Sequence, residues 1–125
     1  MNFNNILIGS ENPLALVAYY SRLFGKPAME EGGYAGWEIG KGFIAVGPHT
    51  EVIGKNSEPG RLLWNIASDD VKADFARLVA AGATVVREPY RPEGMPEGSP
   101  EVWIATFSDP DNNYFQLQTP WQSGA

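Results

Sequence analysis

The side chains in this sequence that could bind or transform a ligand are few, because it contains no cysteine and one histidine. Thiolate nucleophiles and thiolate metal sites are therefore excluded. The histidine, His49, follows Pro48 in a polar stretch, and we interpret it as a surface residue. The remaining candidates lie on predicted strands, and they are Asn5, Trp37, Glu38, Asn65, Trp103 and Gln116.

These candidates suit the recognition of a small molecule better than they suit catalysis. Neutral amides donate and accept hydrogen bonds, and indole rings stack on planar ligands. The alternative is that the amides bond to each other or to water and simply complete the core. Glu38 or Tyr90 could serve as an acid or base, but no motif supports either role, so no catalytic residue is predicted.

One stretch predicts how the last two strands are joined. Residues 107–117 have the pattern of a strand, a tight turn and a second strand. Asp109 and Pro110 suit the first two positions of a type I turn, because Asp can accept from the backbone ahead and Pro fixes φ. The three residues that follow tolerate the positive φ that closes a hairpin. Gln116 then alternates onto the same face as Tyr114.

The first half of the chain predicts a strand, a helix and three more strands. Residues 3–9 alternate as a strand does. Asn12 followed by Pro13 is a strong helix start, and Gly25 supplies a stop, so a helix is predicted over residues 13–24. Short strands joined by glycine turns follow, at residues 28–30, 34–39 and 43–46.

The second half repeats this order. A strand over residues 61–67 leads to an acidic helix cap at Asp69 and Asp70, and the helix that follows ends at Gly82. Its apolar stripe consists of Val71, Phe75, Leu78 and Val79. Gly25 and Gly82 are 57 residues apart, as are Asn12 and Asp69. A fixed offset across cap and stop indicates a duplication.

A repeated unit of this kind predicts the fold class. We expect an α+β fold in which two tandem βαβββ modules form a cupped, mostly antiparallel sheet around a cleft, with the helices outside. The alternative is another α+β sandwich with a ferredoxin-like strand order. The expected organisation is a single domain over residues 1–125, with modules at 3–47 and 61–119, a connecting loop at 48–60 and an inserted loop at 88–100. The insertion could cover one end of the cleft or serve only as a connection.

The closing hairpin resembles that of the vicinal oxygen chelate superfamily, which includes glyoxalases, bleomycin-resistance proteins and extradiol dioxygenases. The signature there is Asp-Pro-Asp-Gly-Asn, followed two residues later by Glu-Leu. This chain has Asp-Pro-Asp-Asn-Asn from Asp109 to Asn113, and then Gln116 and Leu117. The resemblance covers about residues 3–119, and it implies the paired-module fold described above.

The resemblance also implies where a metal would bind in metal-dependent members. Its ligands there are usually His on the first strand of each unit and Glu or His on the last. The matching positions of this chain hold Asn5, Ala45, Leu63 and Gln116. None is a carboxylate or an imidazole, the groups that suit Zn, Fe, Mn or Ni. The spacing of Glu38 and Glu101 does not indicate a metal site either, so we predict neither a metal nor another cofactor.

Composition limits the partners. The 15 acidic and 9 basic residues give a net charge of −6, and no basic cluster interrupts the chain, so nucleic acid and anionic membrane are not expected partners. No apolar run approaches the roughly 20 residues of a membrane span. The N-terminus has neither the basic start nor the apolar run of a signal peptide, and with the absence of cysteine this leads us to expect a cytoplasmic protein.

The combined expectation is a glyoxalase/bleomycin-resistance-like protein that lacks the usual metal ligands and binds a small molecule in its cleft. The resemblance implies a homodimer, because the family often completes its cleft between two chains. Two alternatives stay open. One is a lyase, isomerase or dioxygenase of the same superfamily, with or without a metal, and the other is an accessory interaction domain.

Overall fold

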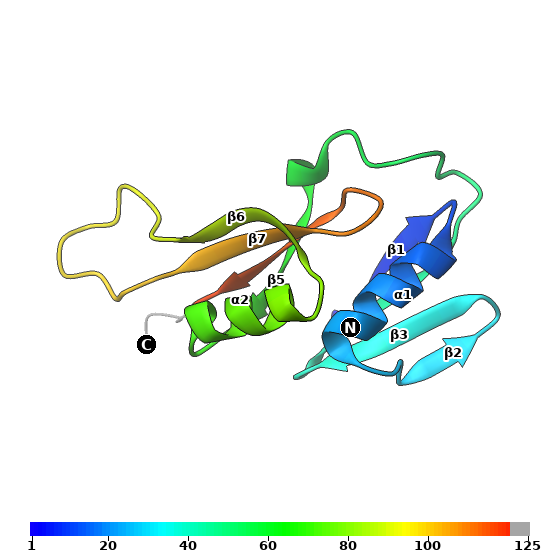
Figure 1. Cartoon of the computed structure of the whole chain (residues 1–125), viewed down its shortest axis with the longest axis horizontal. Helices are drawn as coiled ribbons and strands as arrows, with labels where there is room; N and C mark the ends of the chain where they lie inside the picture. Colours follow the sequence, from blue (N-terminus) through cyan, green and yellow to red (C-terminus); the bar gives the residue numbers. More distant parts are fainter. Residues whose placement is uncertain (121–125) are drawn as a thin grey trace.

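The computed structural model describes residues 1–120, so the last five residues of the expected domain lie outside the described part. The chain forms two βαβββ units in sequence order (Figure 1). The first contains β1 (Ile6–Ser10), α1 (Pro13–Phe24), β2 (Met29–Glu31), β3 (Tyr34–Ile39) and β4 (Gly42–Pro48). The second contains β5 (Leu63–Ala67), α2 (Val71–Ala80), β6 (Thr84–Tyr90), β7 (Ile104–Ser108) and β8 (Tyr114–Gln118).

Each unit forms its own four-stranded mixed sheet. The strand orders are β1-β4-β3-β2 and β5-β8-β7-β6, with a parallel first pair and two antiparallel pairs in each sheet. Within residues 1–120 no hydrogen-bonded strand pair joins the two sheets. The expected α+β class and the tandem βαβββ order are confirmed, and the strands form two sheets that are not closed into one.

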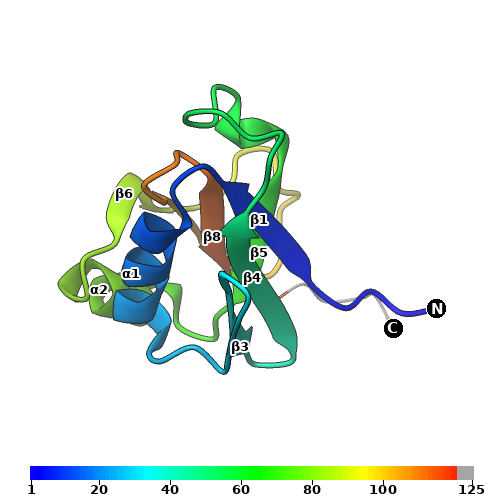
Figure 2. The same cartoon turned by 90° about the vertical axis from the view of Figure 1, so that its right-hand side faces the viewer.

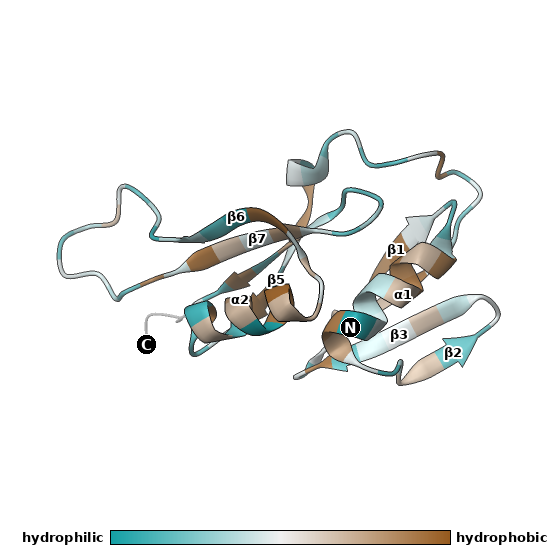
Figure 3. Ribbon diagram, viewed as in Figure 1, coloured by the Kyte–Doolittle hydropathy of each residue, from teal (hydrophilic) through white to brown (hydrophobic). Residues whose placement is uncertain are grey.

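Both helices lie on the same side of the two sheets, as Figure 2 shows. The core lies between helices and sheets, and its largest fully buried side chains include Tyr20 of α1, Trp37 of β3, Phe107 of β7 and Phe115 of β8. Tyr20 contacts the rings of both Trp37 and Phe115, so α1 packs against both sheets. Helix α2 alternates hydrophilic and hydrophobic residues, whereas the connection between β6 and β7 is mostly hydrophilic (Figure 3).

The helix ends differ from expectation at one cap. Helix α1 spans the predicted residues, but the Asn12 side chain makes no capping hydrogen bond. Instead the Asn12 N–H donates to Ser10 Oγ at 2.9 Å, which holds the entry to the helix from the strand side. Helix α2 is capped by Asp70, whose carboxylate accepts from the Ala73 N–H at 3.0 Å. The two caps are therefore 58 residues apart and not 57.

Several element bounds also differ. Strand β1 begins at Ile6, β5 begins at Leu63 after a short 3-10 turn (Pro59–Arg61), and β6 continues to Tyr90. The inserted connection is thus residues 91–103, and the first three residues of the predicted loop belong to a strand. Val79, placed on the apolar stripe of α2 by its spacing, is 41% exposed. In the described part of the chain, no helix is long and apolar enough to cross a membrane.

The two sheets differ on the face that points away from the helices. In the first sheet, Phe43 lies over Gly36 and Tyr34 over Gly47, so close that a Cβ on either glycine would meet the ring. These rings fill the open face of β3 and β4 at the positions where the sheet has no side chain. The open face of the second sheet carries polar side chains instead, among them Asn65, which is exposed, and Thr106, which is buried.

Candidate functional site

The open face of the second sheet brings two predicted site residues together. Asn65 on β5 and Gln116 on β8 are register partners, so their side chains lie next to each other on the same face. Gln116 Nε2 donates to Thr106 Oγ1 at 3.0 Å, across the β7–β8 pair. The neighbouring residues Trp64 and Phe115 are buried on the helix-facing side. Strand alternation therefore places the amides away from the core.

A pocket lies at the end of this face where β7 begins and β8 ends. Its volume is about 350 Å³, within the range of small-molecule sites. Ile104 and Gln118, one alternation step beyond Thr106 and Gln116, line it together with residues of the 91–103 connection. Pro92, Met95, Pro100, Val102, Thr119 and Pro120 complete the wall. We call this the open-face pocket.

The connection that walls the open-face pocket extends well beyond the sheet (Figure 1). It is tied back at its end, because the Trp103 N–H donates to Thr119 Oγ1 at 2.9 Å and the Thr119 N–H to the Trp103 carbonyl at 3.0 Å. Gly94 and Gly98 have positive φ, at 79° and 83°. The two glycines supply the turns that curve the connection.

Two other predicted residues lie around the first sheet. Asn5 precedes β1, is exposed, and donates to Asn4 Oδ1 at 2.7 Å. Glu38 on β3 is exposed and lines a shallow depression beside the β3–β4 turn, together with Asn4 and Phe43. Among the described residues, each of the two amides Asn5 and Gln116 has its hydrogen bond within its own module, and they do not bond to each other.

The two tryptophans are not on the open face. Trp37 is 1% exposed in the core, where its indole N–H donates to the Gly25 carbonyl at 2.8 Å. Trp103 packs beside α2, with Lys72 Nζ 3.9 Å from the centre of its ring, and its indole N–H donates to Glu101 Oε1 at 2.6 Å. The sequence did not decide which strand face either tryptophan occupies. Strand alternation turns Trp37 inward and the α2 contact holds Trp103, so neither lies on the open face.

The residues at the expected metal positions do not fit a divalent transition metal. Ala45, Leu63 and Gln116 lie on the open faces of their strands, and Asn5 lies just ahead of β1. Two apolar side chains and two neutral amides supply no imidazole or carboxylate donor. Across residues 1–120, no three His, Cys, Asp or Glu side chains gather where they could hold an ion.

The closing hairpin instead has a structural role. Asp109 is 4% exposed, and its Oδ1 accepts from the backbone N–H groups of Asp111 and Asn113, both at 2.9 Å. The Asn112 N–H donates to the Asp109 carbonyl at 2.9 Å, which confirms the predicted turn, and Asn112 has a φ of 63°. Asp109 Oδ2 accepts from the Tyr20 hydroxyl at 2.7 Å. The hairpin of the second module is thus fastened to the helix of the first.

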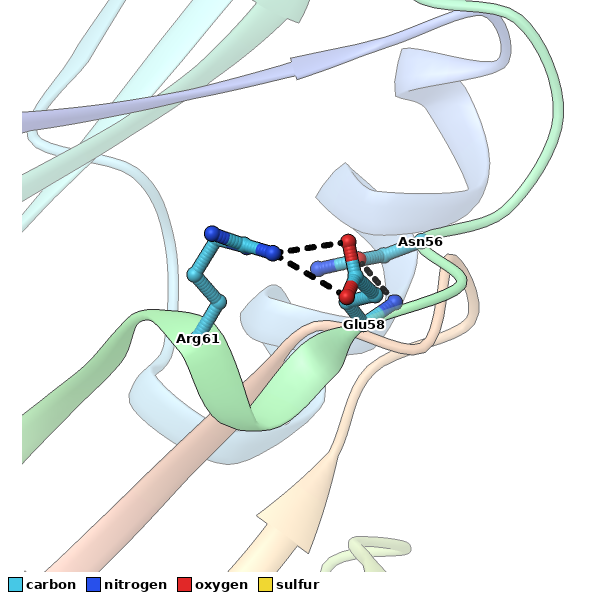
Figure 4. A network of polar contacts seen from close by, with 3 residues as sticks. All are labelled: Asn56, Glu58 and Arg61. Carbon is cyan, nitrogen blue, oxygen red and sulfur yellow. Dashed lines mark hydrogen bonds and ion pairs between the residues drawn. The ribbon is translucent and has the colours of Figure 1, made fainter.

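The segment between β4 and β5 also fastens onto this hairpin. The Asn56 N–H donates to the Asp111 carbonyl at 2.8 Å, and the Asn112 side chain donates to the Asn56 carbonyl at 2.9 Å. Figure 4 shows how the segment continues, with Glu58 N–H donating to Asn56 Oδ1 and the Arg61 guanidinium 3.0 Å from both oxygens of Glu58. The hairpin therefore holds three parts of the chain together.

Burial in this region changes the acidity of three side chains. Burial raises the pKa of the Asp109 carboxyl, and the hydrogen bonds from Asn113, Tyr20 and Asp111 partly offset that rise. The pKa of Tyr20 is raised by its burial and by the neighbouring Asp109. The pKa of Tyr19 is raised by burial, against a hydrogen bond from Thr84. Both tyrosines are therefore neutral donors at neutral pH, which suits a structural role.

Sequence reasoning missed Thr106. It left open that the inserted loop covers one end of the cleft, but it named no residue of that loop as a site residue. Thr106 could have been found by counting outward from the hairpin turn, because it pairs with Gln116 in register. Met95 and Pro92 gave no such signal, since their position depends on how a long connection folds back. The link between Tyr20 and Asp109 joins residues 89 apart, and nothing in their local sequence pairs them.

The fold is that of a paired-module α+β protein. It has two βαβββ units whose first strand pair is parallel, sheet faces that are open opposite the helices, and a closing Asp-Pro-Asp hairpin. Residues 5–118 match the family model of the glyoxalase-like domain. The chain therefore belongs to the glyoxalase-like domain family, within the vicinal oxygen chelate superfamily.

Solved structures support the same fold at low sequence identity. A glyoxalase/bleomycin resistance protein/dioxygenase family enzyme from Burkholderia phytofirmans is 21% identical, with a TM-score of 0.69 over 95% of this chain and 98% of that one. A glyoxalase/bleomycin resistance protein from Albidiferax ferrireducens is 16% identical, with a TM-score of 0.69 over 95% and 98%. TioX from a Micromonospora species is 17% identical, with a TM-score of 0.63 over 99% and 100%. No curated protein matches the chain.

Proposed function

We propose that this protein binds a small, largely apolar molecule in the open-face pocket and does so without a metal. The observation that carries this proposal is a pocket of about 350 Å³ that is lined by Gln118. Gln118 lies two residues along β8 from Gln116, the position where metal-dependent relatives usually hold a metal ligand. Proline, methionine and aliphatic side chains from the 91–103 connection give an apolar body, and Gln118 and Thr119 offer polar atoms. Such a mixture of apolar walls with few polar groups is typical of ligand sites.

Met95 can report binding directly. The chain has three methionines, and Met95 alone of them lines the pocket, so Met1 and Met29 serve as internal controls. With carbon-13 methyl-labelled methionine, a library of neutral aromatic fragments is screened by NMR. The expected result is a saturable shift of the Met95 methyl signal while the signals of Met1 and Met29 stay in place.

A variant that fills the pocket tests the location. Val102→Trp places a large ring among the lining residues and should weaken binding of the fragments found at least tenfold. Leu14→Trp adds the same ring at a position of α1 that is 79% exposed, and binding should not change. If no fragment moves the Met95 signal, small-molecule binding here is refuted and the accessory-domain alternative gains.

Metal analysis tests the other half of the proposal. Protein purified without chelators should contain well under one equivalent of transition metal, because the four expected metal positions hold only amides and apolar side chains. One tightly bound equivalent that is lost in Gln116→Ala would overturn this. Metal-dependent turnover of a hemithioacetal or a catechol would favour an enzyme of the same superfamily.

We also propose that the protein acts as a homodimer in which a second copy covers part of the open faces. Two features support this: the sheets are not closed into one, and Leu7 on the open side of β1 is 48% exposed. Sedimentation equilibrium should give twice the monomer mass. Leu7→Asp should shift the protein toward monomer, and a wild-type protein that stays monomeric at high concentration would refute the proposal.

A further inference from the structure

The register of the second sheet aligns four polar side chains across its open face. Thr106 of β7 pairs with Arg87 of β6 on one side and with Gln116 of β8 on the other. Gln116 in turn pairs with Asn65 of β5. Because register partners point to the same side of a sheet, the four side chains form one line, which we call the polar row. Thr106 accepts from Gln116, so its own hydroxyl hydrogen remains available to a ligand.

The next row along the same strands leads into the open-face pocket. It consists of Tyr90, Ile104, Gln118 and Ala67, which pair with one another in that order. Ile104 and Gln118 line the pocket, and each is two residues from a member of the polar row. Two residues of a strand span about 7 Å. A molecule of the size of naphthalene can therefore lie in the pocket and present one end to the polar row.

Arg87 supplies the charge of the polar row. The side chain is exposed, and its guanidinium carbon lies 3.4 Å from the centre of the Tyr90 ring, which holds the cation beside the row that leads into the pocket. The two ion pairs within residues 1–120 involve other arginines. No carboxylate is among the residues that line the pocket. A guanidinium stacked on a ring keeps the N–H groups at its edge free, and these can bind both oxygens of a carboxylate.

We propose that the ligand of the open-face pocket is a small apolar carboxylate. Its apolar body lies between the sheet and the 91–103 connection, and its carboxylate pairs with the Arg87 guanidinium, with the Thr106 hydroxyl as a further donor. This inference rests on the proposed binding function, because it concerns the same pocket. A neutral molecule of the same shape fills the pocket but leaves Arg87 without a partner, so the polar row selects for the negative charge.

Naphthoate and naphthamide form a matched pair of probes, because they have the same shape and differ in charge at pH 7. The shift of the Met95 methyl signal during titration gives the affinity of each probe at the pocket. The wild-type protein should bind naphthoate about tenfold more tightly than naphthamide, which corresponds to about 1.4 kcal/mol. Added salt should reduce this preference and leave the affinity for naphthamide unchanged, because it screens the charge pair.

Arg87→Gln removes the cation at an exposed position and keeps a polar side chain. The variant should lower the affinity for naphthoate about tenfold and change that for naphthamide less than about twofold. Arg91→Gln is the matched control, since Arg91 is also exposed and precedes the pocket-lining Pro92 but lies outside the polar row. It should change the affinity for naphthoate less than about twofold.

The proposed function and this inference fail in different ways. If neither probe moves the Met95 signal at its solubility limit, both proposals are wrong. If naphthamide binds at least as tightly as naphthoate, the pocket binds small molecules but does not select a carboxylate. Equal losses in Arg87→Gln and Arg91→Gln would show that any nearby positive charge attracts the probe, and would overturn the role of Arg87.

Discussion

Replacing Tyr20 by Phe should test whether the link between the modules stabilises the fold. The Tyr20 ring is fully buried, and its hydroxyl donates to Asp109 Oδ2 at 2.7 Å. Phenylalanine keeps the ring and its contacts with Trp37 and Phe115, so the main loss is one hydrogen bond to a buried carboxylate. Asp109 Oδ2 would keep the Asn113 side chain, at 3.0 Å, as its remaining partner.

The expected loss in the free energy of unfolding at pH 7 is about 1.5–3 kcal/mol, the range for hydrogen bonds to charged groups. For a chain of 125 residues this corresponds to a Tm lower by roughly 5–15 °C. The effect should depend on pH. The Tyr20 hydroxyl favours the ionised form of Asp109, so its removal should raise the pKa of Asp109 further. The loss should therefore be smaller at low pH, where Asp109 is protonated.

The pH dependence of the stability of the wild-type protein follows from the same pKa shift of Asp109. Burial raises the pKa of Asp109 above its unfolded value of 3.8, so the folded state holds the proton to higher pH. The stability that this carboxyl contributes is fully present below its pKa in the unfolded chain. That contribution is lost as the pH rises through its pKa in the folded protein. The hydrogen bond from Tyr20 limits that loss.

Urea unfolding of both proteins at several pH values between about 4 and 8 measures these differences. Tyr34→Phe is the control, because that ring is 37% exposed and its hydroxyl is 3.3 Å from the Pro48 carbonyl, so the expected loss is under about 0.5 kcal/mol. A Tyr20→Phe loss under about 0.5 kcal/mol at pH 7, or a larger loss that does not change with pH, would refute this account of the link.

Three further comparisons of substitutions test local features by urea unfolding. Asp70→Ala should lower the free energy of unfolding by about 1 kcal/mol because it removes the hydrogen bond that caps α2. Asn12→Ala should lower it by under about 0.5 kcal/mol, because the Asn12 side chain makes no capping bond. Equal losses would contradict the capping assignment. Gly47→Ala should destabilise by at least about 1 kcal/mol, because its Cβ would lie 2.0 Å from the Tyr34 ring, and Tyr34→Ala should relieve most of that loss. Asn112→Ala should be less stable than Asn112→Gly by about 1 kcal/mol, because the backbone there has a φ of 63°, and the reverse order would contradict strain at this turn.

Local chemistry predicted most of the elements. Helix α1 was predicted over its full length because proline, periodic apolar residues and a terminal glycine act within a few residues of one another. The turn at Asp109 was predicted for the same reason. The bounds of β1, β5 and β6 were less accurate, since a strand extends only where a partner strand pairs with it.

The site was harder to predict because it depends on which face of each strand meets a helix and on how a long connection folds. Gln116 was placed correctly relative to Tyr114, and Asn65 lies beside it because β5 pairs with β8. The sequence left the face of Trp37 undecided, because alternation alone does not say which face of a strand meets a helix. The sequence left open whether the insertion covers one end of the cleft, because residues 91–103 have no periodic pattern that predicts how they fold.

The sequence by itself determined the duplicated βαβββ order and the closing turn, because these follow from short-range spacing. The family resemblance located the expected metal positions, and the sequence then provided the side chains that occupy them. Tertiary structure alone decided that Asp109 is buried against Tyr20 and that the 91–103 connection closes a pocket lined by Gln118. It also decided that the Trp64 indole N–H is buried without a hydrogen-bond partner among residues 1–120. The physical reason is that burial and pairing depend on which distant segments meet, and local spacing does not contain that information.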